Sequence, residues 1–515
     1  MNDFTNEPLT DFTKPENRKA QERALAAFRA QDLPLVIGGE RIQTPEKILR
    51  VNPCNPSEVV GRASKAPKEL AERAIQTAAR AFETWSRTSA RQRAELLFRA
   101  ARLMRERRFE LNATMILEVS KSWIEADADT AEAIDFCDFY AREMLRYDAM
   151  NPVTPVPGER NQAFYLPLGL GIVIAPWNFP CAILTGMTTA AIVTGNTVVM
   201  KPASSSPVIA YQVLEILEAA GCPPGVVNYL PCSGGEVGDF LIDHKLTRFV
   251  SFTGSREVGV RIYERAAKVH PGQIWLKRVI AEMGGKDAIV VDDDADLDAA
   301  ASGVVAAAFG FQGQKCSACS RLIATALVYD RLLSLVVEKT KALKVGDVRR
   351  PENSVGAVAD ENQFAKVRSY IEVGKKEGRV LAGGETSGPG YFIEPTVIAD
   401  VDPKARIAHE EIFGPVLAVL RARDFDDALR IANGTEYGLT GAVYSRNREH
   451  LERARREFHV GNLYLNRKCT GALVGGHPFG GFNMSGTDSK AGGRDYLLLF
   501  LQAKSVSEKV GNPSP

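Results

Sequence analysis

Residues 171–201 read GIVIAPWNFPCAILTGMTTAAIVTGNTVVMK, and this stretch predicts a strand, a loop, a helix and a second strand in succession. The run at 171–175, apolar at 172–174, and the β-branched run at 197–200 are the two predicted strands, and the Ala- and Thr-rich residues between them fit a helix. Two strands that are joined by a helix lie parallel in one sheet. Their nearly continuous apolar character indicates a sheet that is covered by helices on both faces.

The same region resembles a membrane segment only in its lack of charge. Residues 161–200 contain no Asp, Glu, Lys or Arg, and a membrane-spanning helix needs about 20 mostly apolar residues. Prolines and glycines interrupt the run at Pro167, Gly169, Gly171, Pro176, Pro180, Gly186 and Gly195. The polar first 20 residues also lack the apolar segment of a secretory signal. We therefore expect no membrane association and interpret these strands as buried within the protein.

The alternation of strands and helices continues along the chain. A long helical region at 67–147 and a Pro-rich stretch at 151–158 come first, and a second unit begins near residue 296 with a helix predicted over 297–311. The further predicted strands lie at 226–230, 248–252, 288–291, 321–328, 391–397, 415–422 and 439–444. This pattern predicts the α/β class, with two α/β units built on mostly parallel sheets.

Composition excludes several classes of protein. The 515 residues suffice for about three domains of about 150 residues each. Lys and Arg number 64 and Asp and Glu 63, so the net charge of +1 gives no general attraction to nucleic acid or to acidic membranes. Eight dispersed cysteines indicate reduced thiols in a cytoplasmic protein. Cys316 and Cys319 have C-x-x-C spacing, but no second pair or nearby histidine completes a zinc site, so no metal is expected.

Three polar positions follow predicted strands, where open parallel sheets bind their ligands. Lys201 ends one strand, the turn Thr253-Gly254-Ser255 follows another and opens a helix, and Glu282 lies between an apolar strand and two glycines. A helix N-terminus can bind phosphate, and a partly buried glutamate can act as a general base. Taken singly, each position is also explained by a solvated side chain or an ordinary turn between a strand and a helix.

Cys316, in the stretch GQKCS at 313–317, is a candidate nucleophile. Lys315 precedes it, and a positive neighbour lowers the pKa of a thiol, whose thiolate form is the nucleophile. The alternative, for any one of eight cysteines, is an inert thiol of the core. No histidine adjoins Cys316 to suggest a Cys–His pair.

Six motifs, taken in their order, resemble those of the aldehyde dehydrogenase superfamily. They are Pro176-Trp177-Asn178-Phe179-Pro180, Lys201-Pro202-Ala203, Phe252-Thr253-Gly254-Ser255, Glu282-Met283-Gly284-Gly285-Lys286, Gly313-Gln314-Lys315-Cys316 and Glu411-Ile412-Phe413-Gly414-Pro415. The resemblance implies a Rossmann-like dinucleotide-binding domain at 1–150 and 171–287 and an α/β catalytic domain at 288–485. It also implies a β-hairpin oligomerisation element at 151–170 and 486–515, and hence a homodimer or a dimer-based hexamer.

The resemblance implies the roles of three catalytic residues. Cys316 attacks the aldehyde carbon to form a thiohemiacetal, and loss of a hydride leaves a thioester. The Asn178 side-chain amide and the Cys316 backbone N–H stabilise the oxyanion, as donors that meet charge while it develops. Glu282 activates the water that hydrolyses the thioester, so covalent capture divides one difficult oxidation into two easier steps.

NAD is the cofactor that the resemblance implies, and NADP is an open possibility. Many NAD-preferring members have a glutamate three residues after the lysine, where this chain has Ser204. A carboxylate there repels a 2′-phosphate and a serine does not. The implied cofactor-binding residues are Pro176, Trp177, Lys201, Ser204, Gly254, Ser255, Gly284, Glu411 and Phe413.

Further stretches narrow the resemblance: GQKCSACSR at 313–321, NRKCTGALVGGHPFGG at 466–481 and NEPLTDF at 6–12. They are similar to those of members that oxidise L-glutamate γ-semialdehyde, which forms from 1-pyrroline-5-carboxylate, to L-glutamate in proline catabolism. The residues implied in substrate binding are Glu132, Lys315, Ser317, Gly471, Ala472 and Phe479. Two alternatives stay open: a dehydrogenase for another small aldehyde such as succinate semialdehyde, and a catalytically silent binding protein on the same fold.

Overall fold

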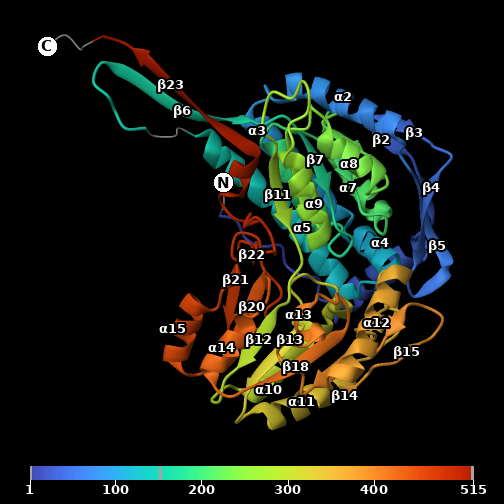
Figure 1. Ribbon diagram of the computed structural model, residues 1–515. Helices are drawn as coiled ribbons and strands as arrows, with labels where there is room; N and C mark the ends of the chain where they lie inside the picture. The colour runs from blue at the N-terminus through green and yellow to red at the C-terminus, as the bar shows by residue number, and fades with distance from the viewer. Residues whose placement is uncertain (1–2, 150–152, 512–515) are drawn as a thin grey trace.

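The structure is a computed structural model that describes residues 3–149 and 153–511. Asn151 and Pro152, with which the predicted Pro-rich stretch begins, lie outside the described residues. Two seven-stranded sheets, each covered by helices, form the two halves of the body (Figure 1). The α/β class that we expected from the sequence is confirmed.

The first sheet is parallel through five neighbouring strands and carries two antiparallel strands at one edge. In spatial order its strands are β11 (Arg278–Glu282), β10 (Phe249–Thr253), β7 (Leu170–Ile174), β8 (Thr197–Lys201), β9 (Val227–Tyr229), β2 (Leu35–Ile37) and β3 (Glu40–Ile42). Strand β7, with the sequence LGIVI, is buried along almost its whole length, as expected for a strand covered on both faces.

The second sheet is parallel except for the edge strand β14. Its spatial order is β14 (Arg379–Ala382), β17 (Thr396–Ala399), β18 (Val416–Ala422), β13 (Arg321–Thr325), β12 (Ala288–Val291), β20 (Thr440–Tyr444) and β21 (Asn462–Leu465). The chain passes from the first sheet to the second between Glu282 and Ala288. The predicted division into domains stays a prediction.

Helices cover both sheets. Those before the crossover are α1 (Pro15–Ala27), α2 (Lys68–Trp85), α3 (Ala90–Glu106), α4 (Arg108–Val119), α5 (Trp123–Asp148), α6 (Ala182–Val193), α7 (Pro207–Ala219), α8 (Glu236–Asp243) and α9 (Arg256–Ala267). Those after it are α10 (Leu297–Phe309), α11 (Tyr329–Lys341), α12 (Glu361–Glu377), α13 (Arg406–His409), α14 (Phe425–Asn433) and α15 (Arg448–Glu457). No helix in 3–149 or 153–511 is long and apolar enough to cross a membrane.

Smaller pieces complete the chain. They are the sheet β1 (Gln31–Leu33), β5 (Asn55–Ser64) and β4 (Lys47–Asn52), the pairs β15 (Thr386–Ser387) with β16 (Phe392–Ile393) and β19 (Tyr437–Gly438) with β22 (Phe482–Asn483), and the 3-10 helices η1 (Gly310–Gly313) and η2 (Tyr496–Phe500). Helix α10 ends at Phe309, so the predicted helix over 297–311 is two residues too long. The predicted strand at 321–328 ends at Thr325, and the one at 391–397 divides into β16 and β17.

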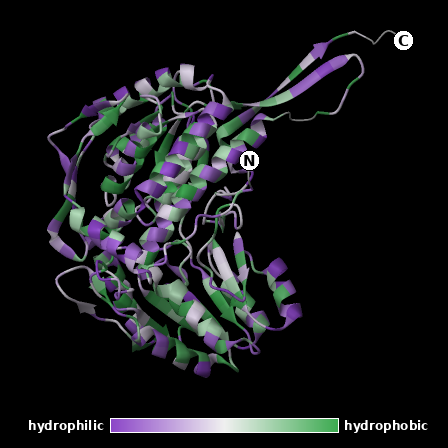
Figure 2. Cartoon of the chain, turned by 180° about the vertical axis from the view of Figure 1, so that it is seen from behind, coloured by the Kyte–Doolittle hydropathy of each residue, from purple (hydrophilic) through white to green (hydrophobic). Residues whose placement is uncertain are grey.

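A two-stranded ribbon projects from the body (Figure 1). It pairs β6 (Glu159–Pro167) antiparallel with β23 (Leu501–Lys509), which are more than 300 residues apart in sequence. Hydrophilic residues run along much of it, whereas hydrophobic residues concentrate in the body (Figure 2). Immediately before β23, Tyr496, Leu497 and Phe500 are buried in the core. The ribbon therefore starts at a fixed point on the body.

The registers of the first sheet bring polar residues to one edge. Lys201 pairs with Ile174, and Thr253 pairs with Glu282, so β7, β8, β10 and β11 all end at the same level. The loop that contains Asn178 leaves this edge directly after β7. Parallel strands thus place residues from distant motifs side by side at the carboxyl edge, where such sheets bind ligands.

Candidate active site

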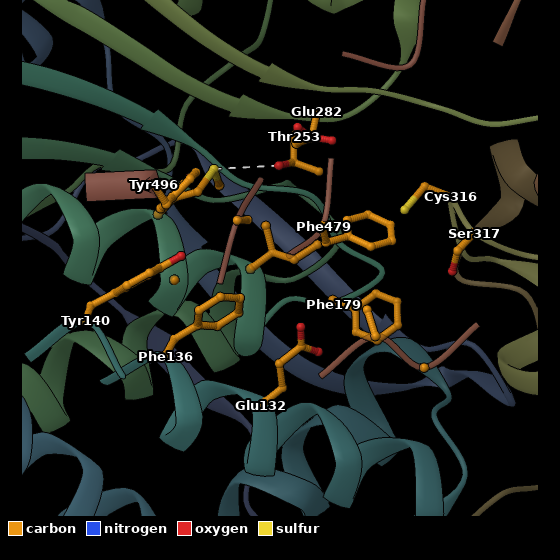
Figure 3. Close-up of a pocket in the computed structure, with 16 residues that line it drawn as sticks. Glu132, Phe136, Tyr140, Phe179, Thr253, Glu282, Cys316, Ser317, Phe479 and Tyr496 are labelled. Atoms are coloured by element: carbon orange, nitrogen blue, oxygen red, sulfur yellow. Dashed lines mark hydrogen bonds between the residues drawn. The ribbon is translucent and has the colours of Figure 1, made fainter. Parts of the chain in front are cut away.

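A cavity of about 120 Å³ lies between helices α5 and α6 and the loops that carry Cys316 and Phe479 (Figure 3). It is mostly apolar, and polar side chains enter it from several elements. Its lining residues are Glu132, Phe136, Tyr140, Phe179, Ile183, Gly186, Met187, Thr253, Glu282, Cys316, Ser317, Gly471, Ala472, Phe479, Ala491 and Tyr496. Most of the residues predicted for catalysis or substrate binding meet here, and Asn178 and Lys315 lie outside the lining.

An unusual backbone carries the thiol of Cys316 to this cavity. After α10, Phe311 (φ 49°), Gln312 (φ 56°) and Gly313 (φ 65°) adopt left-handed conformations, which are strained for the two residues with side chains. The Gln312 side-chain amide donates to the carbonyl oxygens of Ser120 and Ala357, at 3.0 and 2.8 Å. These hydrogen bonds hold the strained turn, which redirects the chain so that Cys316 faces the cavity.

Close packing fixes the loop of Cys316 on its other side. A side chain at Gly285 would collide with the carbonyl oxygen of Cys316 and with the carboxylate of Asp287. The paired glycines after Glu282 therefore allow the two chain segments to approach. Burial raises the pKa of the Cys316 thiol well above its usual value, and the negative charges of Asp287, Glu411 and Glu282 add to this effect. The free thiol is thus protonated at neutral pH.

Asn178 contacts the loop that leads to Cys316. It is 4% exposed, and its side-chain nitrogen donates a 3.1 Å hydrogen bond to the carbonyl oxygen of Gln314. Gln314 is itself buried, and its side-chain oxygen accepts a 2.9 Å hydrogen bond from the backbone N–H of Ala359. The amide of Asn178 is therefore held in a fixed orientation next to the loop of the thiol.

Glu282 enters the cavity from the end of β11, on the side opposite Glu132 (Figure 3). Its Oε1 accepts hydrogen bonds from Oγ and the backbone N–H of Ser489, at 2.5 and 3.4 Å. Its Oε2 is buried and has no hydrogen-bond partner among the described residues. Burial raises the pKa of Glu282 to about 7, against the lowering effect of the hydrogen bonds from Ser489. A carboxyl group with this pKa can exchange protons at neutral pH.

Glu132 of α5 lies in the opposite wall, and further charged residues lie near it. Burial, together with the charge of Asp129, raises the pKa of Glu132 to about 8. The Lys315 ammonium bonds to Oε1 of Glu125 at 2.7 Å. Although burial opposes ionisation of Glu125, Lys315 and Lys121 hold its pKa below the usual value. The positive charge of Lys315 is therefore neutralised by an ion pair beside the cavity.

Along the carboxyl edge of the first sheet, the predicted cofactor residues form a second group. Lys201 is 8% exposed, and its ammonium makes no hydrogen bond or ion pair within the described chain. Ser255 is the N-cap of α9, where its hydroxyl accepts a 3.4 Å hydrogen bond from the N–H of Val258. Gly254 is half-buried before it, and Ser204 is exposed after β8.

A third group lies between the two halves of the body. Oε1 of Glu411 accepts a 2.9 Å hydrogen bond from the N–H of Gly285, and a side chain at Gly284 would collide with that carboxylate. The rings of Trp177 and Phe413 meet edge to face, with centroids 5.5 Å apart. Pro176 precedes Trp177 and is half-buried. No group of three or more His, Cys, Asp or Glu side chains in 3–149 and 153–511 could hold a metal ion.

Sequence reasoning missed several residues of the site. Phe136, Tyr140 and Met187 line the cavity, but on helices their apolar character predicts only core packing. Glu125 and Ser489 contact predicted site residues through side-chain bonds that join positions about 200 residues apart. Nothing in the sequence of the stretch 485–489 indicates contact with Glu282.

A family model described as "Aldehyde dehydrogenase family" matches residues 41–506. A 1-pyrroline-5-carboxylate dehydrogenase of Geobacillus kaustophilus is 64% identical over 509 residues, which cover 98% of this chain and 99% of that protein. The protein of the same name from Bacillus cytotoxicus is 59% identical over 511 residues, which cover 98% and 99%. A crystal structure of 1-pyrroline-5-carboxylate dehydrogenase from Thermus with bound NAD is 54% identical, with a TM-score of 0.97 and 99% of each chain covered.

Proposed function

The chain belongs to the aldehyde dehydrogenase family, and on this premise we propose that it oxidises L-glutamate γ-semialdehyde to L-glutamate with NAD. The semialdehyde forms when 1-pyrroline-5-carboxylate opens in water, and its oxidation is a step of proline catabolism. Relatives named 1-pyrroline-5-carboxylate dehydrogenase align with 98% of this chain. The observation that carries the proposal is a single cavity that joins a thiol, a carboxyl group with a pKa of about 7 and the loop at 471–472.

The residues at the sheet edge fit a dinucleotide. Lys201 is a mostly buried residue at the end of β8, and its ammonium, which has no partner among the described residues, suits the oxygens of a ribose. The N-terminus of α9 at Ser255 suits a pyrophosphate, because free backbone N–H groups point outward there. Glu411, with Phe413, suits the second ribose. When NAD is bound, it supplies the acceptor for the hydride.

We assign the first half of the reaction to Cys316 and Asn178. The thiol sulfur bonds to the aldehyde carbon and gives a thiohemiacetal, while its proton passes to Glu282, a base in the same cavity. The second N–H of the Asn178 amide, which is not used in the bond to Gln314, stabilises the oxyanion together with the backbone N–H of Cys316. Departure of a hydride from that carbon leaves a thioester on Cys316.

The second half of the reaction is assigned to Glu282. After the proton taken from the thiol has passed to solvent, the Glu282 carboxylate removes a proton from a water molecule, and the hydroxyl oxygen attacks the thioester carbon. The carbon–sulfur bond then breaks, which releases the carboxylate product and restores the thiol. A pKa of about 7 suits this role because the base form is populated near neutral pH while remaining basic enough to activate water.

The substrate's α-carboxylate and ammonium need partners at the far end of the cavity. We propose that the Ser317 hydroxyl and the backbone N–H groups of Gly471 and Ala472 bind the carboxylate. Gly471 has φ +79°, a conformation that glycine adopts without strain. Phe479 packs against the aliphatic chain, and Glu132 faces the ammonium from α5. Lys315 contributes through its ion pair with Glu125, which orders the loop before the thiol.

The remaining proposals concern the whole molecule. We assign residues 1–150 and 171–287 to cofactor binding, 288–485 to the catalytic domain, and 151–170 with 486–515 to oligomerisation through the ribbon β6–β23. The expected assembly is a dimer or a dimer-based hexamer. A cytoplasmic location is consistent with eight cysteines that are all free.

The test measures NADH formation from 1-pyrroline-5-carboxylate, succinate semialdehyde and propanal, with Cys316→Ala as the blank. Turnover of 1-pyrroline-5-carboxylate far above the other two, absent from the variant, is the expected result. Substrates that lack the charged group for which the site is built should be turned over much more slowly, because the donors of the site are then left unpaired. Preference for succinate semialdehyde or propanal would overturn the proposed substrate and keep the thioester chemistry.

A further inference from the structure

Glu282 is held by a loop of the C-terminal region that no catalytic motif includes. Residues 485–489 run along the end of β11, where the N–H of Met283 donates to the carbonyl oxygen of Ser485 at 2.8 Å. The N–H of Thr487 donates to the carbonyl oxygen of Ala281 at 2.9 Å. Backbone bonds on both sides of Glu282 thus fix this loop in place.

The loop ends with a hydroxyl donor aimed at the carboxylate. Ser489 is 5% exposed, and its Oγ donates to Oε1 of Glu282 at 2.5 Å. The opposite oxygen, Oε2, is the one that has no partner among the described residues. One carboxylate oxygen is therefore fixed, and the other is left for a water molecule or a proton.

We propose that Ser489 is a positioning residue for the thioester-hydrolysis step, which orients the Glu282 carboxylate and stabilises its ionised form. This inference rests on the proposed function only in taking Glu282 as the base that activates water. The hydroxyl acts through Glu282, because Ser489 is not among the residues that line the cavity.

The other groups around Glu282 do not replace this hydroxyl. The Lys490 ammonium donates to the carbonyl oxygens of Gly461 and Gly480, at 2.7 and 2.8 Å, so it acts on Glu282 only through its charge. The thiol of Cys316 and the phenol of Tyr496 line the same cavity, and their own pKa values are raised above the usual range. Both are neutral near pH 7. The backbone N–H of Ser489 makes only a longer bond to Oε1, at 3.4 Å.

Removal of the Ser489 hydroxyl should change the pKa of Glu282 in one direction only. A hydrogen bond to the charged form of an acid lowers its pKa, so Ser489→Ala should raise the pKa of Glu282. Loss of one charge-assisted hydrogen bond should shift the hydrolysis profile upward by about one pH unit. For a base with a pKa of about 7, that shift slows hydrolysis about eightfold at about pH 6.5 and leaves the rate at about pH 9 nearly unchanged.

The experiment follows hydrolysis of a thioester without any hydride step. 4-Nitrophenyl acetate acylates the thiol of the full-length protein, and intact-protein mass spectrometry then follows loss of the acetyl group across pH. The proteins compared are the wild type, Ser489→Ala, Ser489→Thr, which keeps a hydroxyl, and Glu282→Gln. We expect an upward shift for Ser489→Ala, return toward the wild-type profile for Ser489→Thr, and an unchanged KM for the semialdehyde in separate assays.

Two results would overturn the proposal. A Ser489→Ala profile that coincides with the wild type, or that is lowered by one factor at every pH, would leave the hydroxyl with no role or only a structural one. The Glu282→Gln variant distinguishes failure of the inference about Ser489 from failure of the proposed function. If that variant loses its acetyl group as fast as the wild type, Glu282 is not the base and both inferences fail. If it is slow while Ser489→Ala behaves as the wild type, this inference alone fails.

Discussion

The side-chain amide of Asn178 donates a 3.1 Å hydrogen bond to the carbonyl oxygen of Gln314, two residues before Cys316. This bond uses one of the two N–H groups of the amide and fixes the plane of the other. Because Asn178 follows β7 of the first sheet and Cys316 precedes β13 of the second, the bond also joins the two halves of the body at the thiol. The proposed stabilisation of the oxyanion therefore depends on how the two halves meet.

Asn178→Ala should lower kcat by about 10²–10³-fold, because one preorganised donor to the oxyanion is lost. KM should change little, since the ground-state aldehyde has not yet developed the charge. The measurement is steady-state NADH formation. Unchanged labelling of Cys316 by iodoacetamide is the control for an intact thiol loop. A variant that keeps kcat and loses only substrate affinity would contradict the role assigned to the amide.

The pH dependence of thioester hydrolysis should follow the ionisation of the Glu282 carboxyl group. Burial raises the pKa of this carboxyl to about 7, and only the deprotonated form accepts a proton from water. Hydrolysis of acetylated Cys316 should thus be slow below about pH 6, rise through about pH 7 and level off above about pH 8. Glu282→Gln should be slow across this range. A wild-type profile that is flat from about pH 5 upward would place the pKa of the base at the usual carboxyl value and exclude the assignment.

Alkylation should single out Cys316 among the eight cysteines. It is half-buried, and the other seven are buried. Since burial and the charges of Asp287, Glu411 and Glu282 raise its pKa, the thiolate fraction of the free enzyme should grow about tenfold per pH unit between about pH 7 and 8.5. Peptide mass spectrometry after iodoacetamide treatment measures site and rate, with Cys316→Ala as the unlabelled control. A rate that is already constant at about pH 7 would show a thiolate in the resting enzyme.

The strands of both sheets were predictable from the residue pattern where they are continuously apolar, whereas the ribbon was implied only by the family resemblance. Strand β23 is exposed from its second residue to its last, so it lacks the alternation that indicates a strand. It exists through backbone pairing with β6, a partner more than 300 residues away. The left-handed turn at Phe311 and Gln312 escaped prediction for a different reason. Neither residue type favours positive φ, and the buried bonds of the Gln312 side chain impose it.

In the site, the residues that belong to sequence motifs were predicted, and the residues that join the site only through tertiary contacts were not. Cys316 and Glu282 were predicted, and they meet in one cavity. Lys315 was implied in substrate binding as a positive residue next to Cys316. Its ion pair with Glu125 of α5 shows why sequence neighbours alone do not define the electrostatics of a buried position.

Cofactor choice should depend on Ser204. This residue is exposed just after β8, three positions beyond Lys201. Ser204→Glu should reduce kcat/KM for NADP by about tenfold or more, about 1.4 kcal/mol, because a carboxylate repels the 2′-phosphate. Activity with NAD should be kept. Ser204→Gln is the matched control, similar in size and without charge. Equal losses with both cofactors, or with both variants, would mean that steric effects rather than charge act at this position.

Assembly should depend on β23. A two-stranded ribbon is marginally stable alone, and eight of the nine residues of β23 are exposed in the single chain. We therefore expect a second copy to cover the ribbon. A chain that stops after Leu501 should give a smaller species in multi-angle light scattering, while the buried residues of η2 keep the body folded. A chain that stops after Lys509, where β23 ends, is the control and should assemble as the full chain does. Unchanged assembly after removal of β23 would show that the interface lies on another surface.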